Sequence, residues 1–194
     1  EGRPGWHIEC SAMSMKYLGE TLDIHSGGTD LTFPHHENEV AQAEAATGKP
    51  FVRYWIHNGY LLIDKEKMSK SLGNFLTARA ALQKYPAKAI RLFMLSAHYR
   101  SPINFSEESL NQSLGAVERL ENCWSDLEHA RKNRKTTSDG SRNEFESLFK
   151  EFEDRFVTAM DDDFNTAAAL GVLFEAVKTV NTYLKETQTL EESF

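Results

Sequence analysis

The sequence predicts an α/β region followed by an all-helical region. In the first third of the chain, short strand-like runs alternate with short helical patterns, and glycines separate them. After about residue 76 the apolar residues recur at helical spacing to the end of the chain. A loop rich in lysine, serine and glycine, residues 64–74, separates the two patterns. We therefore expect a change of architecture at this loop.

The α/β region is expected to contain two helices and several strands. Gly19 is suited to end the first helix, and Gly48 with Pro50 to end the second, which Pro34 opens because a first-turn residue needs no N–H. An Asn58-Gly59 turn divides the last apolar run into two strand-like segments. The expected elements are a helix over Ile8–Leu18, a strand over Thr21–His25, a helix over Pro34–Thr47 and strand-like runs within Phe51–Ile63.

The second region is expected to be helical throughout. Ser106 and Ser141 are suited to cap helices, and Asn165 or Thr166 can cap the last one. Residues 132–140 contain no apolar run and form a predicted linker. Phenylalanines spaced along one predicted helix suggest a buried aromatic stripe: Phe145, Phe149, Phe152 and Phe156. The expected helices cover Thr77–Lys84, Ala87–Ala97, Ser106–Lys132, Ser141–Met160 and a last segment through Leu184.

Composition excludes several classes of protein. The chain has 194 residues, 40% of them hydrophobic and 26% charged, which is typical of a globular protein. No apolar run approaches the roughly 20 residues of a membrane span, so we expect no membrane partner. The two cysteines, Cys10 and Cys123, form no disulfide framework, which indicates a reducing, cytoplasmic setting; Cys123 lies on an apolar helical face and is expected in the core.

The net charge of −7 is distributed unevenly. Residues 64–100 carry 8 basic and 2 acidic side chains, whereas both flanking regions are acidic. A basic segment between acidic flanks can bind phosphate groups locally. A polyanionic ligand therefore remains compatible with an acidic protein.

A candidate metal site lies in the segments His25–Asp30 and Phe33–Glu39. If Pro34 starts a helix, His35 and Glu39 stand four residues apart on one face, as two ligands on a helix must. The spacing equally allows His36 with Glu39, and Cys10 could add a thiolate. The alternative is a polar helix start with solvated side chains, because these residues alone form an incomplete ligand set.

Several segments, in order, resemble one family. Lys67-Met68-Ser69-Lys70-Ser71 matches the KMSKS signature of class I aminoacyl-tRNA synthetases. Gly5–Cys10, Asp23–Asp30 and Phe33–Glu39 resemble the catalytic segments of the cysteine-specific branch, and Asp161–Ala167 resembles the start of its helical, DALR-type domain. The resemblance spans nearly the whole chain.

The resemblance implies the second half of a Rossmann-type catalytic domain followed by a helical bundle. The implied segments are residues 1–76 with the zinc site and the KMSKS loop, residues 77–135 as connecting helices that contact tRNA, and residues 136–194 as the start of the DALR-type domain. The implied reaction is ATP-dependent ligation of L-cysteine to tRNA(Cys) through cysteinyl-adenylate. The family's HIGH-type signature and a fourth zinc ligand are expected before Glu1, so we expect a fragment that is inactive by itself.

The resemblance also assigns roles to residues. It makes Cys10, His35 and Glu39 ligands of Zn²⁺, which distinguishes a substrate thiol from a hydroxyl because a thiol ionises readily and binds the metal as a soft thiolate. Trp6 would form a wall of the substrate site, with a core tryptophan as the alternative. His25 would meet the polar end of the substrate or orient a neighbouring side chain.

ATP, with Mg²⁺, is the second implied ligand. Asp30, after Gly27 and Gly28, resembles the carboxylate that binds the ATP ribose, and it could also cap the helix that Pro34 opens, since the two roles are compatible. Lys67 and Lys70 would act as catalytic cations on the phosphates, with Lys70 in direct contact. A solvated basic loop is the alternative for both lysines.

Four further basic residues could contact the tRNA backbone or form a solvated face: Lys84, Lys88, Arg91 and Arg100. Two other functions remain open. A ligase that joins cysteine to an aminosugar shares the zinc site and a KMSKS-like loop, and a non-catalytic zinc- or RNA-binding fragment would need neither ATP nor cysteine. The sequence is compatible with a monomer.

Overall fold

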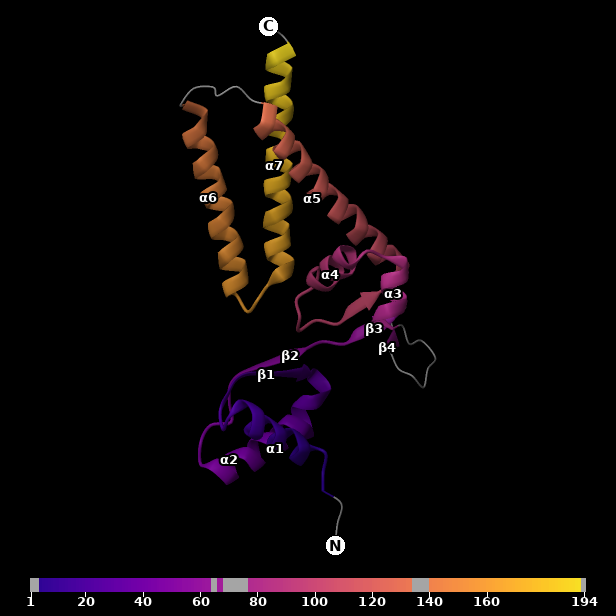
Figure 1. Cartoon of the computed structure of the whole chain (residues 1–194), viewed down its shortest axis with the longest axis vertical. Coiled ribbons are helices and arrows are strands. Elements are labelled where there is room, and N and C mark those ends of the chain that lie inside the picture. Colours follow the sequence, from indigo (N-terminus) through magenta and orange to yellow (C-terminus); the bar gives the residue numbers. More distant parts are fainter. Residues whose placement is uncertain (1–3, 64–65, 68–76, 134–139, 193–194) are drawn as a thin grey trace. The chain divides into compact units, whose positions relative to one another are not determined.

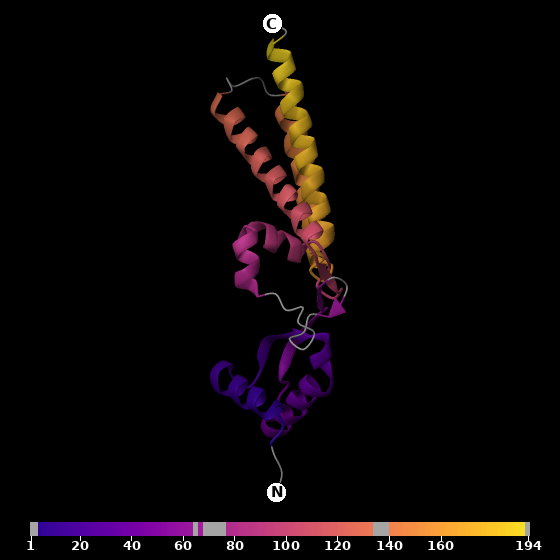
Figure 2. The same cartoon turned by 90° about the vertical axis from the view of Figure 1, so that its right-hand side faces the viewer.

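The structure of the chain is a computed structural model that describes residues 4–63, 66–67, 77–133 and 140–192. Side chains are described for residues 4–63, 77–132 and 146–185. The chain divides into two compact units. Unit 1 comprises Glu1–Tyr60 with Arg100–Pro102, and unit 2 comprises Leu61–Tyr99 with Ile103–Phe194. Figures 1 and 2 show the elements of each unit.

Unit 1 is a small α/β layer. Strands β1 (Leu22–Gly28) and β2 (Val52–Asn58) pair in parallel, and helices α1 (His7–Leu18) and α2 (Glu37–Thr47) pack beside them (Figure 1). Parallel neighbours require a crossover, which the segment containing α2 supplies. Three buried side chains form the apolar core: Leu22, Ala43 and Phe51.

The predicted helix ends of unit 1 are confirmed. Gly19 follows α1 with φ of 97°, and Gly48 follows α2 with φ of 69°. Left-handed backbone of this kind carries no steric penalty in glycine, because it has no Cβ. The Gly48 N–H also donates to the carbonyl of Glu44, which satisfies one of the last carbonyls of the helix.

Two details of unit 1 differ from the sequence prediction. β1 continues through Gly27 and Gly28, so the glycines end the strand instead of forming a loop after it. α2 begins at Glu37, after a helical segment over Thr32–His36 in which Phe33 is extended. The helical path from Pro34 onward still places His35 and Glu39 one turn apart, which is the feature the site requires.

Unit 2 joins a three-stranded sheet to a set of helices. β3 (Leu61–Ile63) pairs antiparallel with β4 (Glu66–Lys67) and parallel with β5 (Ile103–Phe105). The strand β5 corrects the expectation that everything after residue 76 is helical. Its three residues are too short for alternation to show in the sequence, and pairing with β3 forms the strand. The helices are α3 (Ala78–Lys84), α4 (Ala87–Leu95), α5 (Glu107–Asn133), α6 (Gly140–Asp161) and α7 (Thr166–Glu192).

The helices of unit 2 bury apolar residues of α5 and α7. Cys123 lies in this core with Val177 and Val180, as expected from its apolar helical face. The amide of Ala168 donates to Asn165 Oδ1, so Asn165 caps α7, and α6 runs beside α7 (Figures 1 and 2). The expected aromatic core on α6 is wrong for Phe149 and Phe156, which are 41% and 40% exposed. The helical spacing of these residues places them on one face of α6. It does not predict whether another element packs against that face.

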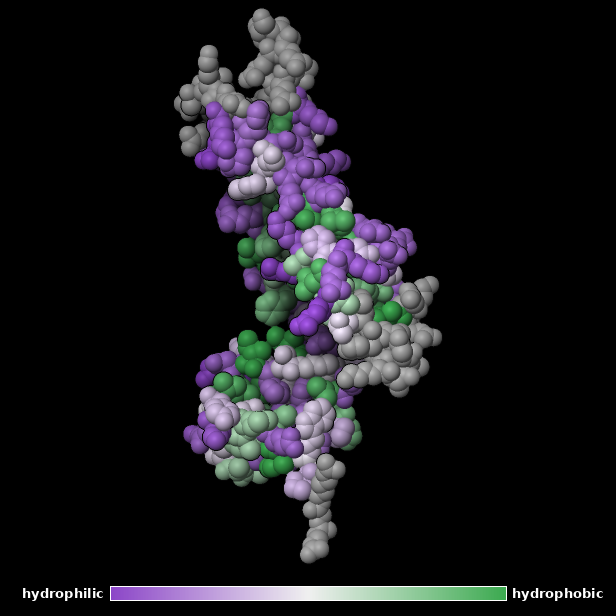
Figure 3. Space-filling view, turned by 45° about the vertical axis from the view of Figure 1, so that its right-hand side comes forward, coloured by the Kyte–Doolittle hydropathy of each residue, from purple (hydrophilic) through white to green (hydrophobic). Residues whose placement is uncertain are grey.

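The fold class, α/β followed by helices, is confirmed apart from β5. None of the described helices combines the length and the apolar character that crossing a membrane requires. In the space-filling view, the described upper part of unit 2 is largely hydrophilic on the face shown, and hydrophobic side chains are visible in its lower part (Figure 3).

Candidate metal and substrate site

Four elements of unit 1 bring polar side chains together. The register of the sheet pairs His25 with Trp55 and Gly27 with His57, so these residues share one face of the β1–β2 pair. The segment that leads into α2 supplies its histidines and Glu39, and α1 adds Cys10. The predicted ligands therefore meet at one place, although the chain separates Cys10 from Glu39 by a strand and a helical segment.

Glu39 is the centre of this cluster. Its side chain is 1% exposed, with Oε1 2.7 Å from His35 Nε2 and Oε2 2.9 Å from His25 Nε2. Burial raises the pKa of this carboxyl group, and the positive charges of His35 and His7 act in the opposite direction. Among the described residues, these two imidazole contacts are ion-pair contacts that do not meet hydrogen-bond geometry, so they compensate the carboxylate only when a ring carries a positive charge. A buried carboxylate in this state is costly unless a cation or a proton compensates it.

Two groups of donor atoms share the Glu39 carboxylate. Cys10, His35 and Glu39 form one group, and His25, His36 and Glu39 form the other; within each, the donor atoms lie within 4.8 Å of one another. Tetrahedral zinc with bonds of about 2.0–2.3 Å separates its ligand atoms by about 3.3–3.8 Å. In both groups the donor atoms need to approach by at most about 1.5 Å to reach this spacing, and the first group has the sulfur, nitrogen and oxygen donors that zinc binds.

In the absence of a cation, the surroundings of the Cys10 thiol disfavour its ionisation. Burial raises its pKa, and the negative charges of Glu39 and Glu9 raise it further. A bound divalent ion reverses this effect because a coordinated thiol loses its proton. The site is therefore suited to a cation rather than to an isolated reactive thiolate.

Other side chains hold the histidine rings. His7 Nδ1 lies 2.8 Å from His35 Nδ1. Ser11 Oγ lies 3.0 Å from the His7 carbonyl oxygen and 2.8 Å from Gln42 Oε1, and its single O–H can donate to either acceptor. On the other side, His36 Nδ1 lies 2.7 Å from His57 Nε2. Such contacts fix the orientation of an imidazole and the nitrogen that carries its proton.

His36 is held in its neutral form. Burial lowers its pKa to about 4, and the nearby positive charges of His25, His57 and His35 contribute. Burial also lowers the pKa of His25. Neutral imidazoles of this kind are the form that donates a lone pair to a metal.

The two glycines of β1 make room for side chains of the protein itself. A Cβ on Gly27 would lie 2.8 Å from His36 Cε1 and 2.9 Å from Leu31 Cδ1. A Cβ on Gly28 would lie 2.5 Å from Asp30 Oδ1. The absence of a Cβ at Gly27 thus makes room for the ring of His36, a histidine of the cluster.

Trp6 and Asp30 border the cluster. The Trp6 ring is centred 4.2 Å from the His35 ring and is 59% exposed, so it is not a core tryptophan. Asp30 is exposed in the helical turn Thr29–Leu31. The residue that precedes α2 is His36, without a side-chain cap, so the additional role of Asp30 as the cap of α2 is wrong.

The side chains of the KMSKS lysines lie outside the described residues. Lys70 lies outside the described residues, and of Lys67 only the backbone in β4 is described. Their predicted roles therefore stay predictions.

Sequence reasoning missed His57, Trp55 and Gln42. His57 holds His36, and the Trp55 ring stacks on His57 with an interplanar angle of 2° and meets His25 edge-on. The signal lay in β2, where Trp55 and His57 stand two residues apart and so share a face. Gln42 lies one turn after Asn38 on α2, and nothing in its local sequence indicates its contact with Ser11.

Comparison with known proteins places this geometry in a family. A family model described as the tRNA synthetases class I (C) catalytic domain matches residues 1–115, which is more than half of the chain. The chain belongs to this family. A second model, the DALR domain, matches residues 155–193, so the catalytic-domain segment of this class I synthetase chain precedes a DALR segment, in the predicted order.

Curated relatives are similar over almost the whole chain. It is 55% identical over 193 residues to the cysteine–tRNA ligase of Caldicellulosiruptor saccharolyticus, covering 97% of this chain and 41% of that protein. It is 56% identical over 187 residues to the cysteine–tRNA ligase of Geobacter metallireducens, covering 96% of this chain and 39% of that protein. The class I synthetase chain thus spans about two fifths of the length of these relatives.

Solved structures share the fold at low sequence identity. Mycobacterium tuberculosis methionyl-tRNA synthetase in complex with methionyl-adenylate aligns with a TM-score of 0.70 at 20% identity, covering 86% of this chain and 34% of that one. LeuRS from Agrobacterium radiobacter K84, in a ternary complex with tRNA and LeuAMS, aligns with a TM-score of 0.66 at 20% identity, covering 85% and 23%. At this identity the likeness supports the class I fold alone.

Proposed function

We propose that this chain is the cysteine-selecting part of a cysteine–tRNA ligase. The observation that carries the proposal is the buried Cys10, His35 and Glu39 group in a chain that is more than half identical to proteins named cysteine–tRNA ligase. The reaction would activate L-cysteine with ATP as cysteinyl-adenylate and then transfer the cysteinyl group to tRNA(Cys). The relatives' names and the DALR match favour this function over an aminosugar ligase.

Zn²⁺ would be held by Cys10 Sγ, a ring nitrogen of His35 and the Glu39 carboxylate. The buried oxygens of Glu39 and the mixed donor set fit such an ion, and the thiolate favours zinc over magnesium or calcium. When bound, zinc would supply preferential affinity for a thiol over a hydroxyl. His36, the alternative ligand from the sequence, belongs to the second donor group and contacts His57.

The other residues of the cluster would orient the ligands and the substrate. His7 would keep the His35 ring in place through its Nδ1 contact, and His25 would orient Glu39, which it contacts directly. Of the two roles that the resemblance gave His25, this contact supports the orientation of a neighbour. Trp6, exposed above His35, would form an aromatic wall for a small side chain.

ATP with Mg²⁺ would be bound by residues that follow β1 and by the KMSKS segment. Asp30 would accept hydrogen bonds from the ribose, beside Gly27 and Gly28, and Lys67 and Lys70 would neutralise charge on the phosphates. Exposed Lys84, Lys88 and Arg91, together with Arg100, would contact the tRNA backbone. In this proposal, residues 1–76, 77–135 and 136–194 keep the catalytic, connecting and DALR-type roles.

The decisive experiment uses a protein of the relatives' length that carries this sequence. L-cysteine should drive ATP–pyrophosphate exchange and tRNA charging, and L-serine should not, because size alone distinguishes the two by only about 10–200-fold. Cys10→Ser should lower both the zinc content and the cysteine-dependent exchange. His129→Ala, in α5, is the matched control and should change neither.

The chain by itself should show no exchange, since it spans about two fifths of the relatives' length. Zinc content and exchange that are unchanged in Cys10→Ser would contradict the proposed metal role. Exchange that serine supports as well as cysteine does would contradict the proposed selectivity.

A further inference from the structure

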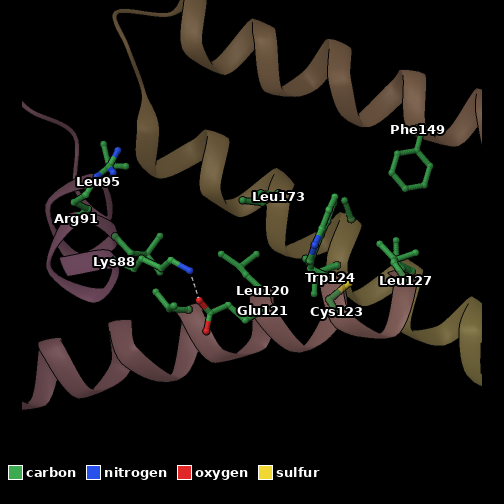
Figure 4. A pocket seen from close by; sticks show the side chains of 15 residues that line it. Lys88, Arg91, Leu95, Leu120, Glu121, Cys123, Trp124, Leu127, Phe149 and Leu173 are labelled. Atoms are coloured by element: carbon green, nitrogen blue, oxygen red, sulfur yellow. Dashed lines mark hydrogen bonds and ion pairs between the residues drawn. The ribbon is translucent and has the colours of Figure 1, made fainter. Parts of the chain in front are cut away.

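A large apolar cavity lies within unit 2. Its volume is about 880 Å³, and helices α4, α5, α6 and α7 supply its walls. Figure 4 shows leucines of α5 and α7 pointing into the space between the helices. Ligand sites of about 300–1,000 Å³ with mainly apolar walls are typical of spaces between the helices of bundles. The apolar walls include Leu92, Leu120, Leu127, Leu173 and Val177.

The cavity opens beside aromatic side chains that are poorly covered. Trp124 on α5 is 68% exposed, and Phe149 on α6 is 41% exposed. Both line the cavity, at the end that also holds Leu127 (Figure 4). Contiguous exposed apolar surface of this kind marks interaction sites more often than single scattered residues do. The opening therefore favours an apolar occupant.

The charged residues of the cavity all lie toward its α4 end. Lys88 reaches across from α4 to an ion pair with Glu121 on α5, so these two charges compensate each other (Figure 4). Arg91, one turn after Lys88, forms no ion pair with any residue in the described part of the chain. Counted over the described residues, the walls of the cavity thus carry one uncompensated positive charge, which lies at one end.

We propose that this cavity binds an elongated apolar carboxylate of the medium-chain fatty acid class. The carboxylate pairs with Arg91, and the hydrocarbon chain lies along α5 from Val117 toward Leu127, a distance of about 15 Å at 1.5 Å per helical residue. A single charged head matches Arg91, which has no ion pair with a described residue, and the hydrocarbon chain matches the apolar walls. This binding site goes beyond the proposed ligase function. Because that function places Arg91 at the tRNA backbone, the carboxylate would compete with a tRNA phosphate for this side chain.

Trp124 provides a direct probe of occupancy. The chain has three tryptophans, and the other two, Trp6 and Trp55, belong to unit 1. A carboxylate with a terminal bromine, 11-bromoundecanoate, should quench Trp124 fluorescence saturably below its micelle concentration. Trp124→Phe should remove the saturable component, because only a tryptophan in the cavity contacts the bromine. Non-saturable quenching, or saturable quenching that survives Trp124→Phe, would place the probe elsewhere and overturn the proposal.

Arg91→Gln tests the carboxylate. An exposed charge pair contributes about 0.2–1 kcal/mol, so Kd for 11-bromoundecanoate should rise about 1.4-fold to fivefold, while Kd for neutral 11-bromoundecanol stays unchanged. Arg79→Gln on α3, an exposed arginine outside the cavity, is the matched control and should change neither Kd. Equal binding of the acid and the alcohol with no effect of Arg91→Gln would overturn the assigned ligand class in favour of a neutral occupant or a partner helix.

Ala176→Phe tests the location by filling the cavity from α7. It should abolish saturable quenching by both compounds, with helical circular dichroism unchanged. If Ala176→Phe loses helicity, the Trp124→Phe and Arg91→Gln measurements test the location and the ligand class of the site. Retained affinity in a folded Ala176→Phe chain would overturn the proposed location.

Discussion

The two units use their interiors differently. Unit 1 buries polar groups, with His35, His36 and Glu39 each at most 5% exposed, around an apolar core of only three residues. Unit 2 buries apolar side chains such as Leu110 and Val180, and its ion pair between Lys88 and Glu121 stays at the surface. Polar groups in a protein interior cost free energy unless each has a partner, whereas apolar groups are stabilised by burial alone.

This difference predicts which unit tolerates substitutions. In unit 1 the orientation of each buried imidazole depends on another side chain, so single substitutions should affect both stability and ligand binding. In unit 2 the helices depend on volume and periodicity, so substitutions away from the core should have small effects.

Phe51→Ala should have the largest effect. The Phe51 side chain is fully buried in the core of unit 1, and its ring contacts those of His25 and Trp55. Removal should cost about 3–5 kcal/mol in the free energy of unfolding and also weaken metal binding. Leu110→Ala, at a fully buried position of unit 2, should cost about 2–5 kcal/mol and leave metal affinity unchanged. Denaturant unfolding measures the loss of stability, and cobalt titration measures metal affinity. Equal losses of metal affinity in the two variants would contradict the expected difference between the units.

Glu39→Gln should lower the affinity for zinc by more than about 100-fold. Loss of a residue that only orients a ligand already costs about 10–100-fold, and Glu39 belongs to both donor groups. Competition with a chelator measures the affinity. Glu37→Gln, on the same helix but exposed, is the control and should keep the wild-type value. A loss smaller than tenfold would remove Glu39 from the proposed ligands.

Gly27→Ala should destabilise unit 1 by about 1–3 kcal/mol, because the added methyl group meets the His36 ring and Leu31 in a packed site. Gly115→Ala in α5 should have the opposite sign, with a gain of about 0.5–1 kcal/mol, since its Cβ would meet nothing within 4 Å and alanine favours a helix. Unfolding monitored by tryptophan fluorescence gives both values. The contrast between the units fails if the two substitutions have the same sign.

Lys88→Gln should have the smallest effect on stability. It removes the ion pair with Glu121, in which both side chains are more than half exposed. Exposed pairs contribute about 0.2–1 kcal/mol, and salt screens them. Unfolding at low and at high salt should show a small loss that shrinks as salt rises. A loss above about 2 kcal/mol in the free energy of unfolding at high salt would contradict this prediction. The exposed pair would then matter as much to unit 2 as the buried polar groups matter to unit 1.

Local patterns predicted the helices and the ligand spacing well. Glycines at positions 19 and 48 ended α1 and α2, and the one-turn spacing of His35 and Glu39 placed their side chains 2.7 Å apart. The three-residue strand β5 and the exposure of Phe149 escaped prediction. Both features depend on neighbouring elements. A three-residue strand forms only when another strand pairs with it, and an apolar helix face is buried only when another element packs against it.

By itself, the sequence determined the succession of elements, the change from α/β to helices and the residue types of the candidate metal site. These follow from periodicity, capping and donor chemistry, which are local properties. Only the tertiary structure decided that Cys10 meets His35 and Glu39, that His57 holds His36, and that Gly27 is small because a histidine ring packs against it. Such contacts join residues far apart along the chain, and the parallel register of β1 and β2 with the crossover through α2 brings them together.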